Sequence, residues 1–244
     1  EQAAGKIGKQ WNELVAASAD SGNANKITAA AGAVLANDKA SAYERSAAAR
    51  MAAYAAIDQE DYSKAVDLLQ QAIQINGLNN NDHYDSYLAI GQLQLAEDKY
   101  QDAVKTFTKL IAETNTTDSK IYASRGNAYY RLEQYPEAIT DLKKAVEFDA
   151  GADIATQQLL MASYIEGGRS AEAVAIAEAQ VAKNPTDKKA NLNLANIYLQ
   201  ADQPEKAAAV FDSMKSKGIL TETSDYETGY KLLASIDGRQ KDAA

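Results

Sequence analysis

The sequence predicts an all-α protein built from repeated helix–turn–helix units, and three observations support this prediction. The 244 residues include only three prolines and are rich in Ala, Leu, Lys, Glu and Gln, which favour helix. Apolar residues return at steps of three and four along most of the chain, which is the period of one helix face. Small residues also recur at a fixed interval, because Gly91 and Gly126 are 35 residues apart, as are Ala103 and Ala138.

The clearest unit extends from Ile121 to Asp149. In its first half, Tyr122, Gly126 and Tyr129 share one helix face. A turn follows, and Pro136 suits the first turn of a second helix, where its missing N–H needs no partner. The second helix has an apolar stripe made of Ala138, Ile139, Leu142, Ala145 and Val146.

This pattern resembles the tetratricopeptide repeat, a helix–turn–helix unit of about 34 residues with small residues at fixed places. The signature positions of that family are held here by Tyr122, Gly126, Tyr129, Ala138, Leu142 and Ala145. The resemblance implies one domain over residues 1–244, wound as a right-handed superhelical solenoid of about six repeats. The expected repeats cover about 8–41, 46–79, 84–117, 119–152, 154–187 and 188–221.

The first expected repeat is degenerate. Trp11, Leu14 and Val15 stand where the family places its aromatic residue, its leucine and its small residue, but Ile27 replaces an expected alanine. The second repeat pairs a thin, alanine-lined helix with a more typical one, and its apolar positions are Ala49, Ala52, Ala53, Ala56, Tyr62, Ala65, Leu69 and Ala72. An Asn-rich loop is expected from Gly77 to Asp82.

The later repeats follow the same order. The third has Tyr87, Ile90, Gly91, Tyr100, Ala103, Phe107 and Leu110 at core positions, and the fifth has Leu160, Met161, Tyr164, Ala173, Ala177 and Val181. The sixth has Leu194, Ala195, Tyr198, Ala207, Phe211 and Met214. Gly167-Gly168 is expected to turn the chain, and Gly218 to end a helix. A capping helix is expected near 225–236.

Composition limits the classes of function. The formal net charge of −9 argues against binding to a nucleic-acid backbone. The absence of cysteine excludes disulfides, thiolate catalysis and thiolate metal sites. No run of 18 apolar residues is present, so no membrane span is expected. The lack of Cys, the abundance of Asn, Gln and Ala, and a start at Glu1 without Met favour an exported bacterial protein, periplasmic by preference, with a cytoplasmic scaffold as the alternative.

The resemblance also implies where a partner would bind. In the family, first helices line a concave groove and second helices face outward. Carried over position by position, the groove residues are Arg50, Tyr54, Gln92, Lys120, Asn127, Tyr130, Arg131, Gln158, Lys189, Asn193 and Asn196. Their amide groups can pair with a peptide backbone, and their cations would concentrate positive charge for an acidic group or a terminal carboxylate. Asn127, Tyr130 and Arg131 form the strongest cluster because they share one face.

Two sharper interpretations have less support. Some family members hold C-terminal carboxylates through a clamp that begins with Lys and Asn one turn apart, but Arg50 and Tyr54 stand at the first such pair. The single histidine, His83, is flanked by Asp82 and Asp85, which makes a poor metal site. A structural role for His83 at a helix start, with Asp82 as N-cap, is the preferred interpretation.

Three functions therefore remain open. The first is a non-catalytic scaffold that binds a peptide or protein segment in its concave groove. The second is a structural or assembly module that works through its convex face or by self-association. An enzyme is the third, although no nucleophile–base pair or phosphate loop is present, and no catalytic residue, metal or cofactor is expected. We favour a monomer.

Overall fold

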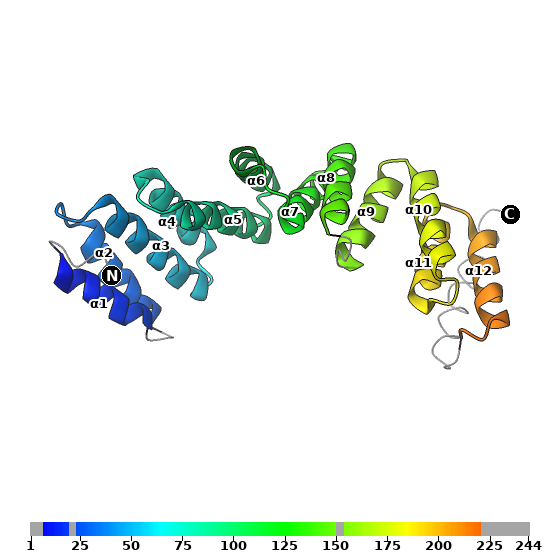
Figure 1. Ribbon diagram of the computed structural model, residues 1–244, viewed down its shortest axis with the longest axis horizontal. Coiled ribbons are helices and arrows are strands. Elements are labelled where there is room, and N and C mark those ends of the chain that lie inside the picture. Colours follow the sequence, from blue (N-terminus) through cyan, green and yellow to red (C-terminus); the bar gives the residue numbers. More distant parts are fainter. Residues whose placement is uncertain (1–6, 20–22, 150–153, 221–244) are drawn as a thin grey trace. The chain divides into compact units, whose positions relative to one another are not determined.

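The structure is a computed structural model that describes residues 7–19, 23–149 and 154–220, and every regular element in these ranges is an α-helix (Figure 1). The helices are α1 (Gly8–Ala19), α2 (Ala24–Leu35), α3 (Ala42–Asp58), α4 (Tyr62–Ile75), α5 (Asn80–Ala96), α6 (Tyr100–Thr114), α7 (Ser119–Arg131), α8 (Tyr135–Phe148), α9 (Ile154–Glu166), α10 (Ser170–Lys183), α11 (Lys188–Gln200) and α12 (Pro204–Ser216). The prediction of an all-α repeat fold is confirmed. The predicted capping helix lies outside the described residues.

The chain forms two compact units. Unit 1 comprises Glu1–Gln134 and Lys144–Gly151, and unit 2 comprises Tyr135–Lys143 and Ala152–Ala244. Within unit 1, each helix from α1 to α7 packs against the next, and the first helices α5 and α7 also touch each other. Within unit 2, α9, α10, α11 and α12 pack in the same consecutive way.

Each hairpin from the second repeat onward turns through the same backbone conformation. One residue of the turn has a positive φ: Glu60, Asp98 and Glu133 in unit 1, and Gly168 and Asp202 in unit 2. The next residue donates its N–H to a carbonyl five residues back, with N···O distances of 2.7–2.9 Å. This is the Schellman ending of a helix, which satisfies carbonyls that the last turn leaves free. From Asp98 onward this ending recurs every 34 or 35 residues, so the repeat in the sequence corresponds to a repeated backbone conformation.

Side chains at the helix starts fix where the first helices begin. Ser41 and Glu44 form a reciprocal capping box at the start of α3. Asn79 caps α5, because its Oδ1 accepts from the backbone N of Asp82 at 2.9 Å. The loop predicted from Gly77 to Asp82 is therefore too long, since α5 already begins at Asn80, and Asp82 is not the N-cap.

Small residues fill the core where helices approach closely. Alanines at 48, 49, 52, 53, 55 and 56 are all buried on α3, so small side chains let α2 and α4 pack closely on this helix. Gly91 is buried against Phe107, and Gly126 and Ala138 are also buried. The prediction of Val15 as a core residue is wrong, since its side chain is 42% exposed and Leu14 takes the buried place on α1.

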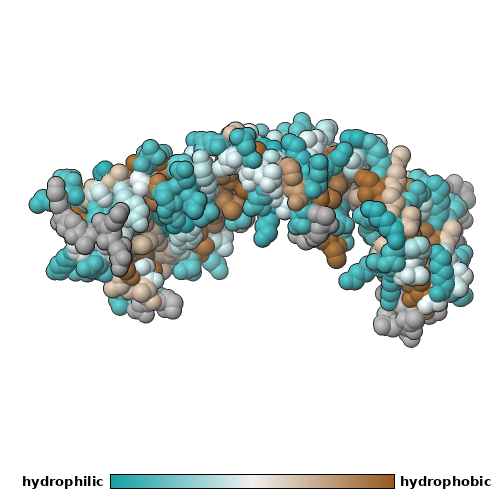
Figure 2. All heavy atoms as spheres, viewed as in Figure 1, coloured by the Kyte–Doolittle hydropathy of each residue, from teal (hydrophilic) through white to brown (hydrophobic). Residues whose placement is uncertain are grey.

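Hydrophilic side chains cover most of the surface visible in Figure 2, and the hydrophobic patches between them are small. Gly218 follows α12 with a φ of +67°, as expected for a helix stop. No helix in the described ranges combines the length and the apolar character that crossing a bilayer requires.

Candidate functional site

The structure places every predicted groove residue on the first helix of a hairpin. Arg50 and Tyr54 lie on α3, Gln92 on α5, and Lys120, Asn127, Tyr130 and Arg131 on α7. We call these residues of α3, α5 and α7, with their exposed neighbours on the same helices, the first-helix face of unit 1. In unit 2, Gln158 lies on α9, and Lys189, Asn193 and Asn196 lie on α11. None of these side chains is fully buried.

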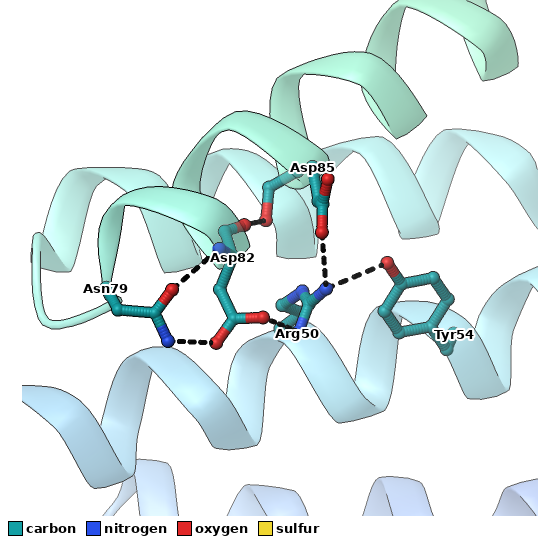
Figure 3. Close-up of polar contacts among 6 residues, drawn as sticks. Arg50, Tyr54, Asn79, Asp82 and Asp85 are labelled. Carbon is teal, nitrogen blue, oxygen red and sulfur yellow. Dashed lines mark hydrogen bonds and ion pairs between the residues drawn. The ribbon is translucent and has the colours of Figure 1, made fainter.

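Arg50 is the centre of a polar cluster that joins α3 to α5 (Figure 3). Its Nη1 donates to Asp82 Oδ1 at 2.6 Å, and its Nη2 donates to the hydroxyl of Tyr54 at 3.4 Å. Nη2 also lies 3.9 Å from Oδ2 of Asp85. The guanidinium carbon is 5.3 Å from the centre of the Tyr54 ring, within the range of a cation–π contact. One arginine therefore contacts an aromatic ring and two carboxylates.

Asp82 has partners on both carboxylate oxygens. Oδ1 accepts from Arg50, and Oδ2 accepts from the Asn79 amide at 2.7 Å. Ser86 Oγ donates to the backbone carbonyl of Asp82 at 2.6 Å. The N-cap of α5 is thus linked to α3 through one carboxylate, which fixes the cluster on the starting turn of a helix.

Arg131 is also engaged within unit 1. Its Nη2 lies 3.7 Å from Asp98 Oδ1, and its guanidinium carbon is 5.0 Å from the centre of the Tyr100 ring. The Tyr100 hydroxyl donates to Asp98, and this hydrogen bond raises the pKa of Tyr100. Arg131 consequently lies against the turn between α5 and α6 on the preceding hairpin.

These contacts correct the charge argument made from the sequence. Arg50 and Arg131 were expected to concentrate positive charge for an acidic partner, but each lies beside carboxylates of its own chain. Arg50 together with Asp82 and Asp85 has a formal charge of −1. This part of the face therefore does not favour an anion.

Asp85 belongs to this face but is absent from the residues predicted from the sequence. It lies 35 residues before Lys120, so it holds the same position on α5 that Lys120 holds on α7. This spacing could have identified it, but the predicted contacts were limited to cations, amides and tyrosines. Its side chain is 62% exposed.

His83 lies in the first turns of α5 and contacts two aromatic rings edge-on. The centroid of its ring is 5.5 Å from that of Tyr84 and 5.3 Å from that of Tyr87. Its flanking aspartates point elsewhere, since Asp82 and Asp85 face Arg50. No group of three His, Cys, Asp or Glu side chains suited to a metal ion occurs among the described residues.

Tyr198 is a buried titratable group of unit 2. Tyr198 on α11 is only 7% exposed, and its hydroxyl donates to Glu178 on α10. Burial, together with this hydrogen bond and the charge of Glu178, raises the pKa of Tyr198 to about 12. This hydrogen bond links α11 to α10.

Comparison with protein families gives a consistent result. A family profile described as tetratricopeptide repeat matches residues 56–127 and 164–217, which is more than half of the chain. A second profile with the same description matches residues 119–150. Among curated proteins, "Protein STIP1 homolog" of Dictyostelium discoideum is 29% identical over 148 residues, or 61% of this chain. The match spans about a quarter of that relative, 25% of its length.

Solved structures show the same fold. A tetratricopeptide repeat protein from Parabacteroides merdae matches with a TM-score of 0.62 and 17% identity, over 96% of this chain and 88% of its own. YrrB, described as a TPR protein with an unusual peptide-binding site, matches with a TM-score of 0.56 and 18% identity, over 84% of this chain and 99% of its own.

Proposed function

Because the chain belongs to the tetratricopeptide repeat family, whose members mediate protein–protein interaction, we propose that it is a non-catalytic scaffold that binds an extended segment of another protein. We place that segment across the first-helix face of unit 1. The proposal needs no cofactor and no reacting group, only a set of accessible side chains held at fixed spacing by packed helices.

One observation supports the proposal above the others. All residues predicted from the sequence as partner contacts lie on first helices, and all keep some exposure to solvent. Asn127, Tyr130 and Arg131 follow one another on a single face of α7, and Gln92 is exposed on α5, which packs beside α7. Amide side chains can both donate to and accept from an extended backbone, which suits a segment without fixed sequence.

A likeness to a solved structure supports the same class of ligand. YrrB is described as having a peptide-binding site, and it shares this fold. At 18% identity the likeness concerns the fold, so the choice of face depends on the residues of this chain.

The test begins with peptides selected by phage display on the full chain and then measures their affinity by calorimetry. Replacing Asn127, Tyr130 and Arg131 by Ala should weaken binding at least about 10-fold, because a few central contacts dominate such interfaces. The matched control replaces Gln70, Gln71 and Gln101, which are exposed on the second helices α4 and α6. Equal affinity of the wild type and the α7 variant would overturn the proposal. Loss of binding in the control alone would favour the assembly function through the outer face.

A further inference from the structure

The cluster around Arg50 retains binding capacity after its internal contacts are counted. Asp82 has a hydrogen-bond partner on each oxygen, Arg50 on one and Asn79 on the other. Asp85 differs, since it approaches the Arg50 guanidinium at 3.9 Å, beyond hydrogen-bonding distance, and its side chain is 62% exposed. The carboxylate of Asp85 therefore keeps most of its hydrogen-bonding positions directed to solvent.

An aromatic surface lies beside this carboxylate. Tyr54 is one of the few large hydrophobic side chains exposed among the described residues of unit 1, at 40%. Its hydroxyl lies 3.4 Å from Arg50 Nη2, and Asp85 Oδ2 lies 3.9 Å from the same nitrogen (Figure 3). The ring and the accessible carboxylate are thus neighbours on two adjacent first helices, separated by a single guanidinium nitrogen.

The charges of the cluster decide which ligand fits. Arg50 is compensated by Asp82 at 2.6 Å, so Asp85 is the excess charge. An anionic group would meet that carboxylate, whereas a cationic side chain would pair with it and lay its methylenes or guanidinium plane on the Tyr54 ring. The net charge of −9 over the whole chain adds a long-range attraction for a basic segment.

We propose that Tyr54 and Asp85 form a subsite for a Lys or Arg side chain of the bound segment. The proposal rests on the proposed function, which it deepens by naming the chemistry of the partner. It assigns to α3 and α5 a preference for a basic side chain. The arginines in the sequence had instead suggested a preference for an acidic group.

The probes are four pools of fluorescein-labelled synthetic dodecapeptides. Each pool has one central position fixed, as Lys, Arg, Gln or Glu. The other positions are random and contain no Cys. Fluorescence anisotropy is measured with the full chain at two salt concentrations. The Lys and Arg pools should bind about 3- to 10-fold more tightly than the Gln pool, and the Glu pool most weakly. The preference should shrink at the higher salt concentration.

Variants assign the preference to the two residues. Asp85→Asn should bring the four pools within about 2-fold of one another, and Asp85→Lys should make the Glu pool the tightest. Tyr54→Ala should reduce the Lys preference to about 2-fold, whereas Tyr54→Phe, which keeps the ring, should retain more than about 3-fold. Asp67→Asn is the matched control, because Asp67 is an exposed carboxylate on the second helix α4. Circular dichroism checks that each variant is folded.

The outcomes separate the two proposals. Equal binding of all pools, with loss of binding in the Asn127, Tyr130 and Arg131 variant, overturns the basic subsite and leaves the scaffold function standing. Tightest binding of the Glu pool to the wild type also overturns the subsite. Absence of binding by every pool, together with failure of the phage selection, overturns both. A Lys preference that Asp67→Asn leaves intact and Asp85→Asn removes supports the subsite.

Discussion

The ring of Phe107 lies directly against Gly91, with no room for a side chain between them. A Cβ placed on Gly91 would lie 2.6 Å from Cε1 and from Cζ of Phe107, and that ring is completely buried. The close approach of α5 to α6 thus depends on a glycine facing an aromatic ring. This is the physical reason for a small residue at the position that recurs 35 residues later as Gly126.

Replacing Gly91 by Ala should therefore destabilise unit 1. Overpacking a core costs about 1–3 kcal/mol, while Ala in place of Gly inside a helix returns about 1 kcal/mol, so we expect a net loss of up to about 2 kcal/mol. Urea unfolding followed by circular dichroism measures it. Gly32→Ala is the control, because Gly32 is an exposed glycine on α2 whose added Cβ would meet no atom within 4 Å. That variant should gain about 0.5–1 kcal/mol, and a similar gain at Gly91 would contradict the packing argument.

Gly77 should tolerate substitution even less. A Cβ there would lie 2.2 Å from the backbone C and O of Ala42, and backbone atoms of a capped helix start cannot rotate away as a side chain can. The Gly77 N–H also donates to the fully buried Ser46 hydroxyl at 3.0 Å, so a shift of the chain would break that bond. We expect Gly77→Ala to cost about 3 kcal/mol or more. A thermal midpoint equal to that of the wild type would show that the α4–α5 connection can move freely.

Much of the fold could be predicted from the sequence because the repeat is a packing requirement. Gly91, Ala103 and Phe107 are buried where the close packing of helices limits the size of the side chain. Residues of the same size therefore recur at the period of the repeat. Helix starts were less predictable. Residues 79–82 all have side chains able to cap a helix, and the choice of Asn79 depends on its bonds to Asp82.

The candidate site was predictable in position but not in charge. The resemblance to the tetratricopeptide repeat placed Arg50 and Arg131 on the first helices, where the structure also places them. Their partners are Asp82, 32 residues away, and Asp98, 33 residues away, and such pairs leave no periodic signal within one helix. A side chain identified from its own helix can therefore be neutralised by a neighbouring repeat.

Tyr198 predicts a specific loss of stability in alkali. Its pKa is about 12 in the folded chain, above the value near 10 usual for an exposed tyrosine, so the folded state holds its proton more tightly than the unfolded state. The tighter hold on this proton stabilises the folded state. The stabilisation is fully present below about pH 10 and is lost as the pH rises from about 10 to about 12. The free energy of unfolding should fall by up to about 3 kcal/mol more in the wild type than in Tyr198→Phe over that interval.

Urea unfolding at several pH values measures this difference, and tyrosine absorbance reports the titration directly. Glu178→Gln is the companion variant, because it removes the charge that helps to raise the pKa of Tyr198. The high-pH titration step should move to lower pH in that variant. Parallel stability profiles for the wild type and Tyr198→Phe would show that this hydroxyl has no part in the alkaline transition.

Arg50→Gln should lower the stability of the protein and raise its affinity for a Lys side chain. This combination distinguishes a basic subsite from the acidic partner that the sequence suggested. The Arg50 and Asp82 side chains are 23% and 30% exposed, so losing their hydrogen bond should lower stability by about 1–2 kcal/mol. The same change removes the cation beside Asp85, and at about 4 Å near a protein surface such a charge alters binding by a few-fold or more. We therefore expect the Lys-fixed peptide pool to bind about 3- to 5-fold more tightly to Arg50→Gln than to the wild type.

If Arg50 instead attracts acidic partners, the variant would lose affinity for the Glu-fixed pool and gain none for the Lys-fixed pool. Anisotropy titrations with both pools decide between these results.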